Sequence, residues 1–126
     1  MIAAFAAIVA LTCVPTATDG DTVRCGPERI RLLGIDAPEM PGHCRQGRVC
    51  VSGDPFVSRD NLAKLLAQGP YTIERVGTDR YGRTLAVLAA HDGNVSCAQL
   101  TAGVAEYVGK WDNGGRIAAA CPAVAR

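Results

Sequence analysis

The chain has 126 residues, a formal net charge of +1, 48% hydrophobic residues and 20% charged residues. This composition predicts one globular domain with a genuine core and excludes a disordered chain, and no apolar run reaches the roughly 20 residues that a membrane-spanning helix needs. A net charge so near zero also excludes a strong overall field for polyanions, so an anionic ligand would have to be attracted by a local cluster of basic residues.

The first residues, MIAAFAAIVALTC, allow two interpretations. Their apolar stretch has about the length of the hydrophobic region of a signal peptide, with small residues where a peptidase could cut, although no Lys or Arg stands near Met1. The same residues could instead lead into a buried first strand. We favour export and divide the chain into a lead-in at 1–12 and a domain at 13–126.

The six cysteines also favour export to an oxidising compartment. The chain has no C-x-x-C pair, and His43 and His91 stand far apart, so three disulfides are favoured over a thiolate metal site. An even number of cysteines in a small chain is typical of an oxidising compartment, which predicts a periplasmic or secreted protein without stable membrane association. The sequence leaves many pairings open; we prefer Cys13 with Cys25, Cys44 with Cys50, and Cys97 with Cys121.

In the first half of the domain, the sequence predicts strands and one long loop. Residues 11–18 and 21–26 are expected to be strands around a turn at Asp19-Gly20, and RIRLLGI at 29–35 is expected to be a third strand. Arg31 falls at the end of this strand that we expect to face solvent. Residues 37–53 contain Pro38, Pro41 and three glycines, and form a loop long enough to be functional rather than a simple connection.

The second half begins with the best-marked helix, at about 55–68. Asp54 can cap it, Pro55 suits its first position, and Gly69-Pro70 can end it. Two further strands are expected at 71–77 and 83–90, followed by a short helix at about 96–102. Five strands with a helix between the third and fourth predict a mainly β domain with helices (α+β), arranged as a partly open barrel of the oligonucleotide/oligosaccharide-binding type, the OB-fold.

Three charged segments fall at strand ends or turns: DGDT at 19–22, RLLGIDAPE at 31–39 and DRYGR at 79–83. Taken singly, each could be an ordinary turn, a solvated loop or a surface ion pair. Together they supply carboxylates for a hard divalent cation, a carboxylate to orient or deprotonate water, and guanidinium groups to neutralise a phosphate. The residues concerned are Asp21, Arg31, Asp36, Glu39 and Arg83.

With D-G-D-T-V, R-L-L-G-I-D-A-P-E and D-R-Y-G-R in this order and spacing, the chain resembles the thermonuclease, or staphylococcal nuclease-like (SNase-like), family from about residue 12 to residue 111. The middle motif is the specific one. The resemblance implies an OB-fold barrel of the SNase-like type and Ca²⁺ bound by the carboxylates of Asp21 and Asp36 and the carbonyl of Ala37.

The resemblance also implies roles for the remaining site residues. Glu39 would be the general base acting on the attacking water, and Arg31 and Arg83 would bind the phosphate. Tyr81 and Tyr107 fall at positions where the family contacts the nucleotide. The implied activity is Ca²⁺-dependent endonucleolytic hydrolysis of DNA and RNA that leaves 3′-phosphate ends, and we expect a monomer.

The chain departs from the family's best-known member in three ways. That member has a second tyrosine at the position of Gly109, for which Trp111 is the candidate replacement as a stacking surface. Its long C-terminal helix is replaced here by a short tail with Cys121. It is also strongly basic, whereas this chain is almost neutral, which predicts weaker binding to long polyanions.

Two other hypotheses belong to different functional classes. A catalytically silent OB-fold module could bind nucleic acid or a protein partner, as do family domains that have lost their catalytic residues, but here all five charged positions are intact. A structural module held by disulfides would leave the two arginines and three carboxylates without a role. We therefore favour the nuclease.

Overall fold

The computed structural model describes residues 6–126 and has a mixed α+β architecture with a strand-rich sheet and three α-helices. The signal-peptide interpretation of residues 1–12 falls partly on residues 1–5, which lie outside the described residues. The strands are β1 (Ile8–Leu11), β2 (Thr16–Asp19), β3 (Thr22–Cys25), β4 (Glu28–Leu32), β5 (Ile35–Asp36), β6 (Tyr71–Thr78), β7 (Thr84–Ala90), β8 (Gly93–Asn94) and β9 (Glu106–Tyr107).

The sheet has seven strands in the order β1-β6-β7-β4-β3-β2, with β8 paired to β7, and β5 pairs with β9 separately. Neighbouring strands are antiparallel except β4 and β7, which are parallel. This architecture confirms the predicted fold class and is consistent with the SNase-like OB-fold. Among the described residues no pairing joins the two edges, β1 and β2, so the sheet is open.

Two of the expected strands were wrong in extent. The single strand expected at 11–18 is two strands, β1 pairing with β6 and β2 pairing with β3. Pro15 lies between them, and proline has no N–H for a ladder hydrogen bond, so one continuous strand is disfavoured there. The consequence is that only β2 and β3 flank the turn at Asp19-Gly20. The strand expected at 29–35 is also two: β4 ends at Leu32, and Ile35 begins β5, which pairs with β9 in a separate sheet.

The helices are α1 (Pro55–Leu65), α2 (Val95–Thr101) and α3 (Arg116–Ala120). As predicted, Asp54 caps α1: its side chain accepts hydrogen bonds from the amides of Phe56 and Val57, and Pro55 occupies the first turn. The helix ends three residues earlier than the predicted 68. Two 3₁₀ turns, η1 (Gly109–Trp111) and η2 (Asn113–Gly115), lead into α3.

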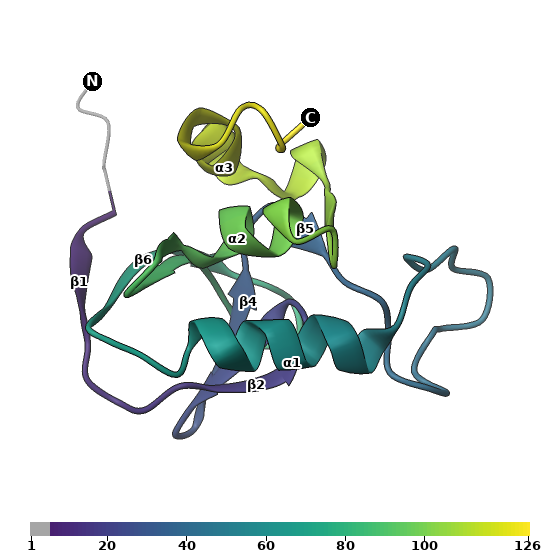
Figure 1. Cartoon of the computed structure of the whole chain (residues 1–126), viewed down its shortest axis with the longest axis horizontal. Helices are drawn as coiled ribbons and strands as arrows, with labels where there is room; N and C mark the ends of the chain where they lie inside the picture. The colour runs from purple at the N-terminus through teal and green to yellow at the C-terminus, as the bar shows by residue number, and fades with distance from the viewer. Residues whose placement is uncertain (1–5) are drawn as a thin grey trace.

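The core lies between the sheet and helices α1 and α2, which run side by side (Figure 1). It is made of aliphatic side chains that alternate along the strands with outward-facing residues, as a half-buried sheet requires. Its fully buried members include Ile30, Leu32, Leu62, Ile73, Leu88 and Val95. The loop between β5 and α1 projects away from this body (Figure 1).

All six cysteines form disulfides, and the pairs are the predicted ones: Cys13–Cys25, Cys44–Cys50 and Cys97–Cys121. The first joins the segment between β1 and β2 to the end of β3. The second closes a ring inside the long loop, and the third ties α2 to the residue after α3. No helix among the described residues is long and apolar enough to cross a membrane.

Candidate active site

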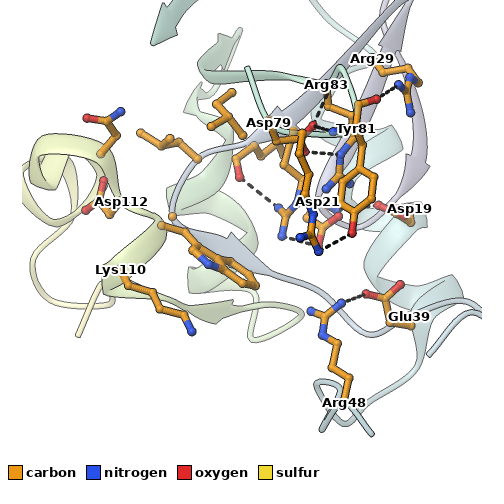
Figure 2. A pocket seen from close by; sticks show the side chains of 18 of the residues that line it. Asp19, Asp21, Arg29, Glu39, Arg48, Asp79, Tyr81, Arg83, Lys110 and Asp112 are labelled. Carbon is orange, nitrogen blue, oxygen red and sulfur yellow. Dashed lines mark hydrogen bonds and ion pairs between the residues drawn. The ribbon is translucent and has the colours of Figure 1, made fainter. Parts of the chain in front are cut away.

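The three charged segments meet in one cleft of about 1020 Å³ (Figure 2). The ends of β2 and β4, the long loop, the β6–β7 hairpin and the η1–η2 segment all contribute residues. Basic side chains are concentrated here although the chain is almost neutral, which is the local cluster that an anionic ligand requires. They are Arg29, Arg31, Arg45, Arg48, Arg80, Arg83 and Lys110.

Asp21 and Asp36 face the same arginine nitrogen. Arg31 Nη2 lies 3.4 Å from Asp21 Oδ2 and 3.7 Å from Asp36 Oδ1, and all three side chains are about 10% exposed. A second nitrogen of the guanidinium, Nη1, donates to the carbonyls of Ile35 and Leu32 at 2.9 and 3.2 Å. These two anchors fix Arg31 between the carboxylates, so its side chain is largely covered rather than lying at a solvent-facing end of its strand.

Asp21 is held as a carboxylate by its surroundings. Its Oδ2 accepts the Ala37 amide at 2.9 Å and its Oδ1 accepts the Thr22 hydroxyl at 3.0 Å. Burial alone would raise the pKa of Asp21, but the Arg31 guanidinium and these hydrogen bonds outweigh it and lower the pKa below its usual value. For the neighbouring Asp19, burial and the nearby Asp21 carboxylate raise the pKa to about 7.

The carboxylate oxygens of Asp21 and Asp36 are suitable ligands for a hard divalent cation. Oδ1 of Asp36 is buried, faces Arg31 Nη2 at 3.7 Å and accepts no hydrogen bond, so this oxygen can take a further ligand. Carboxylate and carbonyl oxygens are what Ca²⁺ or Mg²⁺ prefers. Among residues 6–126 no three His, Cys, Asp or Glu side chains converge on a metal position, so a cation here would also need a backbone carbonyl, water or phosphate oxygen as ligands.

Arg83 is positioned by a residue to which the sequence analysis gave no role, Asp79. The Arg83 side chain donates through Nε to Asp79 Oδ2 at 2.7 Å, and Asp79 Oδ1 accepts the amides of Tyr81 and Arg83, both at 2.9 Å. Burial opposes the ionisation of Asp79, but these hydrogen bonds prevail and lower its pKa. The D-R-Y-G-R hairpin therefore fixes its second arginine in the cleft.

The two predicted nucleotide contacts, Tyr81 and Tyr107, lie in different settings. Tyr81 is exposed in the cleft, where its hydroxyl accepts from Arg45 at 2.7 Å and Arg80 at 2.8 Å. Tyr107 is half-buried and donates its hydroxyl to Asp112 Oδ2 at 2.7 Å. The aromatic side chain that lines the cleft on that side is Trp111, with Arg31 5.4 Å from its ring centre.

Glu39 lies in the cleft, but its partner was not predicted. Arg48, from the same long loop, donates through Nη1 to Glu39 Oε1 at 3.0 Å (Figure 2). It also donates through Nη2 to Asp36 Oδ2 at 2.9 Å. The sequence offered one signal for it, an arginine inside the ring that Cys44 and Cys50 were expected to close.

The comparisons with known proteins show the family of this chain. Residues 29–120, nearly three-quarters of the chain, match the family described as "Staphylococcal nuclease homologue". The chain belongs to this family. It is also 33% identical over 93 residues to a Haemophilus influenzae protein named "Uncharacterized endonuclease", a match that covers 70% of this chain and 47% of that protein. The staphylococcal nuclease homologue described here thus spans about half the length of that relative.

Proposed function

We propose that this chain is an exported, Ca²⁺-dependent endonuclease that hydrolyses phosphodiester bonds in DNA and RNA. The observation that carries the proposal is the cleft lined by Asp21, Glu39, Arg31 and Arg83, with Asp36 in ion-pair contact with Arg31 beside it. Family membership and the endonuclease name of the relative support nucleic acid as the substrate. Three disulfides are compatible with the periplasm or the exterior of the cell.

The metal ligands in this proposal are the carboxylates of Asp21 and Asp36 and the carbonyl of Ala37. When bound, Ca²⁺ would neutralise charge on the phosphate and polarise its oxygens. The Arg31 guanidinium and the Thr22 and Ala37 hydrogen bonds hold Asp21 ionised, so the ligand is ready before the cation arrives. This preorganisation favours the charged form at neutral pH.

The protein's own residues supply the remaining chemistry. Glu39 takes a proton from the attacking water, whose oxygen forms a bond to phosphorus while the bond to the leaving 5′-oxygen breaks, which leaves a 3′-phosphate. Arg31 and Arg83 donate hydrogen bonds to the phosphate oxygens as charge accumulates on them, the kind of stabilisation that contributes most when donors are fixed in advance. Tyr81 and Tyr107 are the proposed nucleotide contacts, with Trp111 as an additional stacking surface.

The experiment is a cleavage assay on plasmid DNA and on structured RNA, with Ca²⁺ and with a calcium chelator. We expect both nucleic acids to be cut internally in Ca²⁺ and neither to be cut in chelator, and end-labelling should detect 3′-phosphate products. Binding of DNA without cleavage in Ca²⁺ would contradict the proposal and favour the silent binding module.

A further inference from the structure

Arg48 joins two carboxylates that have different proposed tasks. Its guanidinium donates to Asp36, a proposed cation ligand, and to Glu39, the proposed base. The Asp36 side chain is 9% exposed and the Glu39 side chain 24%, so Arg48 joins a buried carboxylate to a more accessible one. A planar fork that donates from two nitrogens suits this simultaneous contact, which a lysine could not reproduce.

The two arginines beside Asp36 are held in different ways. Arg31 is anchored by two backbone carbonyls in addition to its ion pairs. Among the described residues, the Arg48 guanidinium donates to no backbone carbonyl: its hydrogen bonds go to Asp36 and Glu39, and its side chain is 39% exposed. Arg31 is therefore fixed by hydrogen bonds to the backbone. Arg48 is held by ion pairs with Asp36 and Glu39, which a bound cation or phosphate would weaken.

The loop keeps Arg48 near the cleft without fixing its tip. Cys44–Cys50 closes a short ring, and the Arg48 amide donates to the Arg45 carbonyl at 3.0 Å inside it. The backbone is thus tied within reach of Asp36. The long aliphatic stem leaves the guanidinium able to reach other acceptors in the same cleft.

A cation on Asp36 and Arg48 on Asp36 would compete. Both are positive, and each satisfies the same buried carboxylate, so binding of one weakens binding of the other. A phosphate offers the displaced guanidinium a bidentate acceptor in the same cleft. An arginine that leaves Glu39 for phosphate also frees that carboxylate to accept a proton from water.

We propose that Arg48 is a positioning residue and the internal counter-ion of the site: it bridges Asp36 and Glu39 in the free protein and transfers to the substrate phosphate when cation and nucleotide bind. This deepens the proposed function and rests on it for the roles of Asp36 and Glu39. It couples the two ligands, because each one favours the state in which Arg48 has left the carboxylates.

The test measures Ca²⁺ binding by calorimetric titration, without any substrate, for the wild type and for Arg48→Met. Methionine keeps an unbranched apolar stem but removes the competing charge, so Arg48→Met should bind Ca²⁺ about 5-fold more tightly. The matched control is Arg59→Met, which changes the net charge equally but removes an arginine that pairs with Asp60 on helix α1, outside the cleft. Its Ca²⁺ affinity should equal that of the wild type.

A second titration, with a nucleoside 3′,5′-bisphosphate present, measures the coupling. The bisphosphate should strengthen Ca²⁺ binding in the wild type by a larger factor than in Arg48→Met. Circular dichroism confirms that each variant is folded. A merely structural role for Arg48 would leave the affinity unchanged or lower it, so the expected gain is diagnostic.

Unchanged or weaker Ca²⁺ binding by Arg48→Met would overturn the inference, as would the absence of measurable Ca²⁺ binding in both proteins. The proposed function fails separately. If the wild type cleaves no nucleic acid but Arg48→Met still gains Ca²⁺ affinity, the counter-ion role stands and the nuclease proposal falls.

Discussion

Two acidic segments face each other in the cleft, and the fold secures them differently. The Asp19–Thr22 turn is buried against the helices: the Gly20 carbonyl accepts a hydrogen bond from Gln99 at 2.8 Å, and the hydrogen bonds to Asp21 come from Thr22 and Ala37. The 37–53 loop that carries Glu39 projects from the body (Figure 1). Its Arg48 forms ion pairs with Asp36 and Glu39.

The buried turn depends on an unusually close approach. A Cβ at Gly20 would lie 1.8 Å from Ser58 Oγ, so only glycine fits between the turn and helix α1. Gln99 is fully buried and donates both to Gly20 and, at 3.0 Å, to the Ser58 carbonyl, while its Oε1 accepts from Asn61 at 2.6 Å. Neutral hydrogen bonds thus fix the Asp19–Thr22 side of the cleft, where we propose the cation binds, in advance.

The difference indicates a division of labour. The proposed cation ligand Asp21 belongs to the framework and keeps its geometry whatever is bound. The proposed base, Glu39, is held by an ion pair with Arg48, and a bound substrate and cation would weaken that ion pair. Preorganisation on one side and ligand-dependent contacts on the other would let the site bind its cation in a fixed place and release its base only when the substrate is present.

The largest effect is expected at the loop side, from Glu39→Gln. The amide keeps the shape but cannot take a proton from water, so kcat for DNA cleavage should fall about 1000-fold, within the usual range for loss of a general base. The dissociation constant of a non-hydrolysable nucleotide should change far less. Glu106→Gln, on β9 opposite Asp36 but outside the main cleft, is the control and should keep wild-type kcat.

Arg83→Lys tests the arginine that Asp79 holds in the cleft. Lysine keeps the charge but loses the planar fork and the Nε–H that contacts Asp79, so kcat should fall about 100-fold with a smaller change in nucleotide affinity. The control is Arg75→Lys, because Arg75 pairs with Glu28 through two hydrogen bonds of 2.8 Å outside the cleft. Near-wild-type turnover of Arg83→Lys would show that the arginine does not meet the transition state.

Gln99→Leu tests the hydrogen bonds behind the turn. The change removes the donor to two buried carbonyls, so the free energy of unfolding should fall by about 2–3 kcal/mol. Urea denaturation measures it, with Gln68→Leu at an exposed position after α1 as the control. A loss no larger than that of the control would mean that these bonds do not stabilise the turn.

The smallest effect on stability is expected in the loop, from the double change Cys44→Ser and Cys50→Ser. Losing the bridge raises the conformational entropy of the unfolded chain, but it also raises that of this exposed loop in the folded state. The free energy of unfolding should therefore fall by less than about 1 kcal/mol. Removing Cys97–Cys121, which ties packed helices, should cost more, about 2–4 kcal/mol. Equal losses for the two bridges, measured by the same denaturation, would contradict the contrast between loop and framework.

Much of this cleft could be predicted from the sequence. The three charged segments, the α1 cap and the cysteine pairs depend on local signals such as Asp-Gly turns, Asp54-Pro55 and Cys spacing. The placement of Arg48 and the inward turn of Tyr107 toward Asp112 could not, because they depend on how an irregular loop and a short tail pack onto distant elements. The spacing of apolar residues along the sequence does not indicate such contacts.

The division of the first expected strand has a similar origin. Residues 11–18 have the composition of one strand, but β1 pairs with β6, whose partner residues lie sixty or more positions away in the sequence. Pairing over that separation depends on which sheet edge is free, and Pro15 only marks where the break falls. Sequence patterns therefore predicted the elements better than their partners.

The central claim is that Asp21 belongs to a cation site that serves phosphodiester cleavage. The measurement is the initial rate of plasmid cleavage against Ca²⁺ concentration for the wild type, Asp21→Asn, and Asp92→Asn in the exposed β7–β8 turn as control. We expect a Ca²⁺-dependent rate that chelator abolishes, a loss of about 100-fold or more in Asp21→Asn, and no change in Asp92→Asn. Chelator-resistant cleavage, or a wild-type Ca²⁺ response from Asp21→Asn, would contradict the claim.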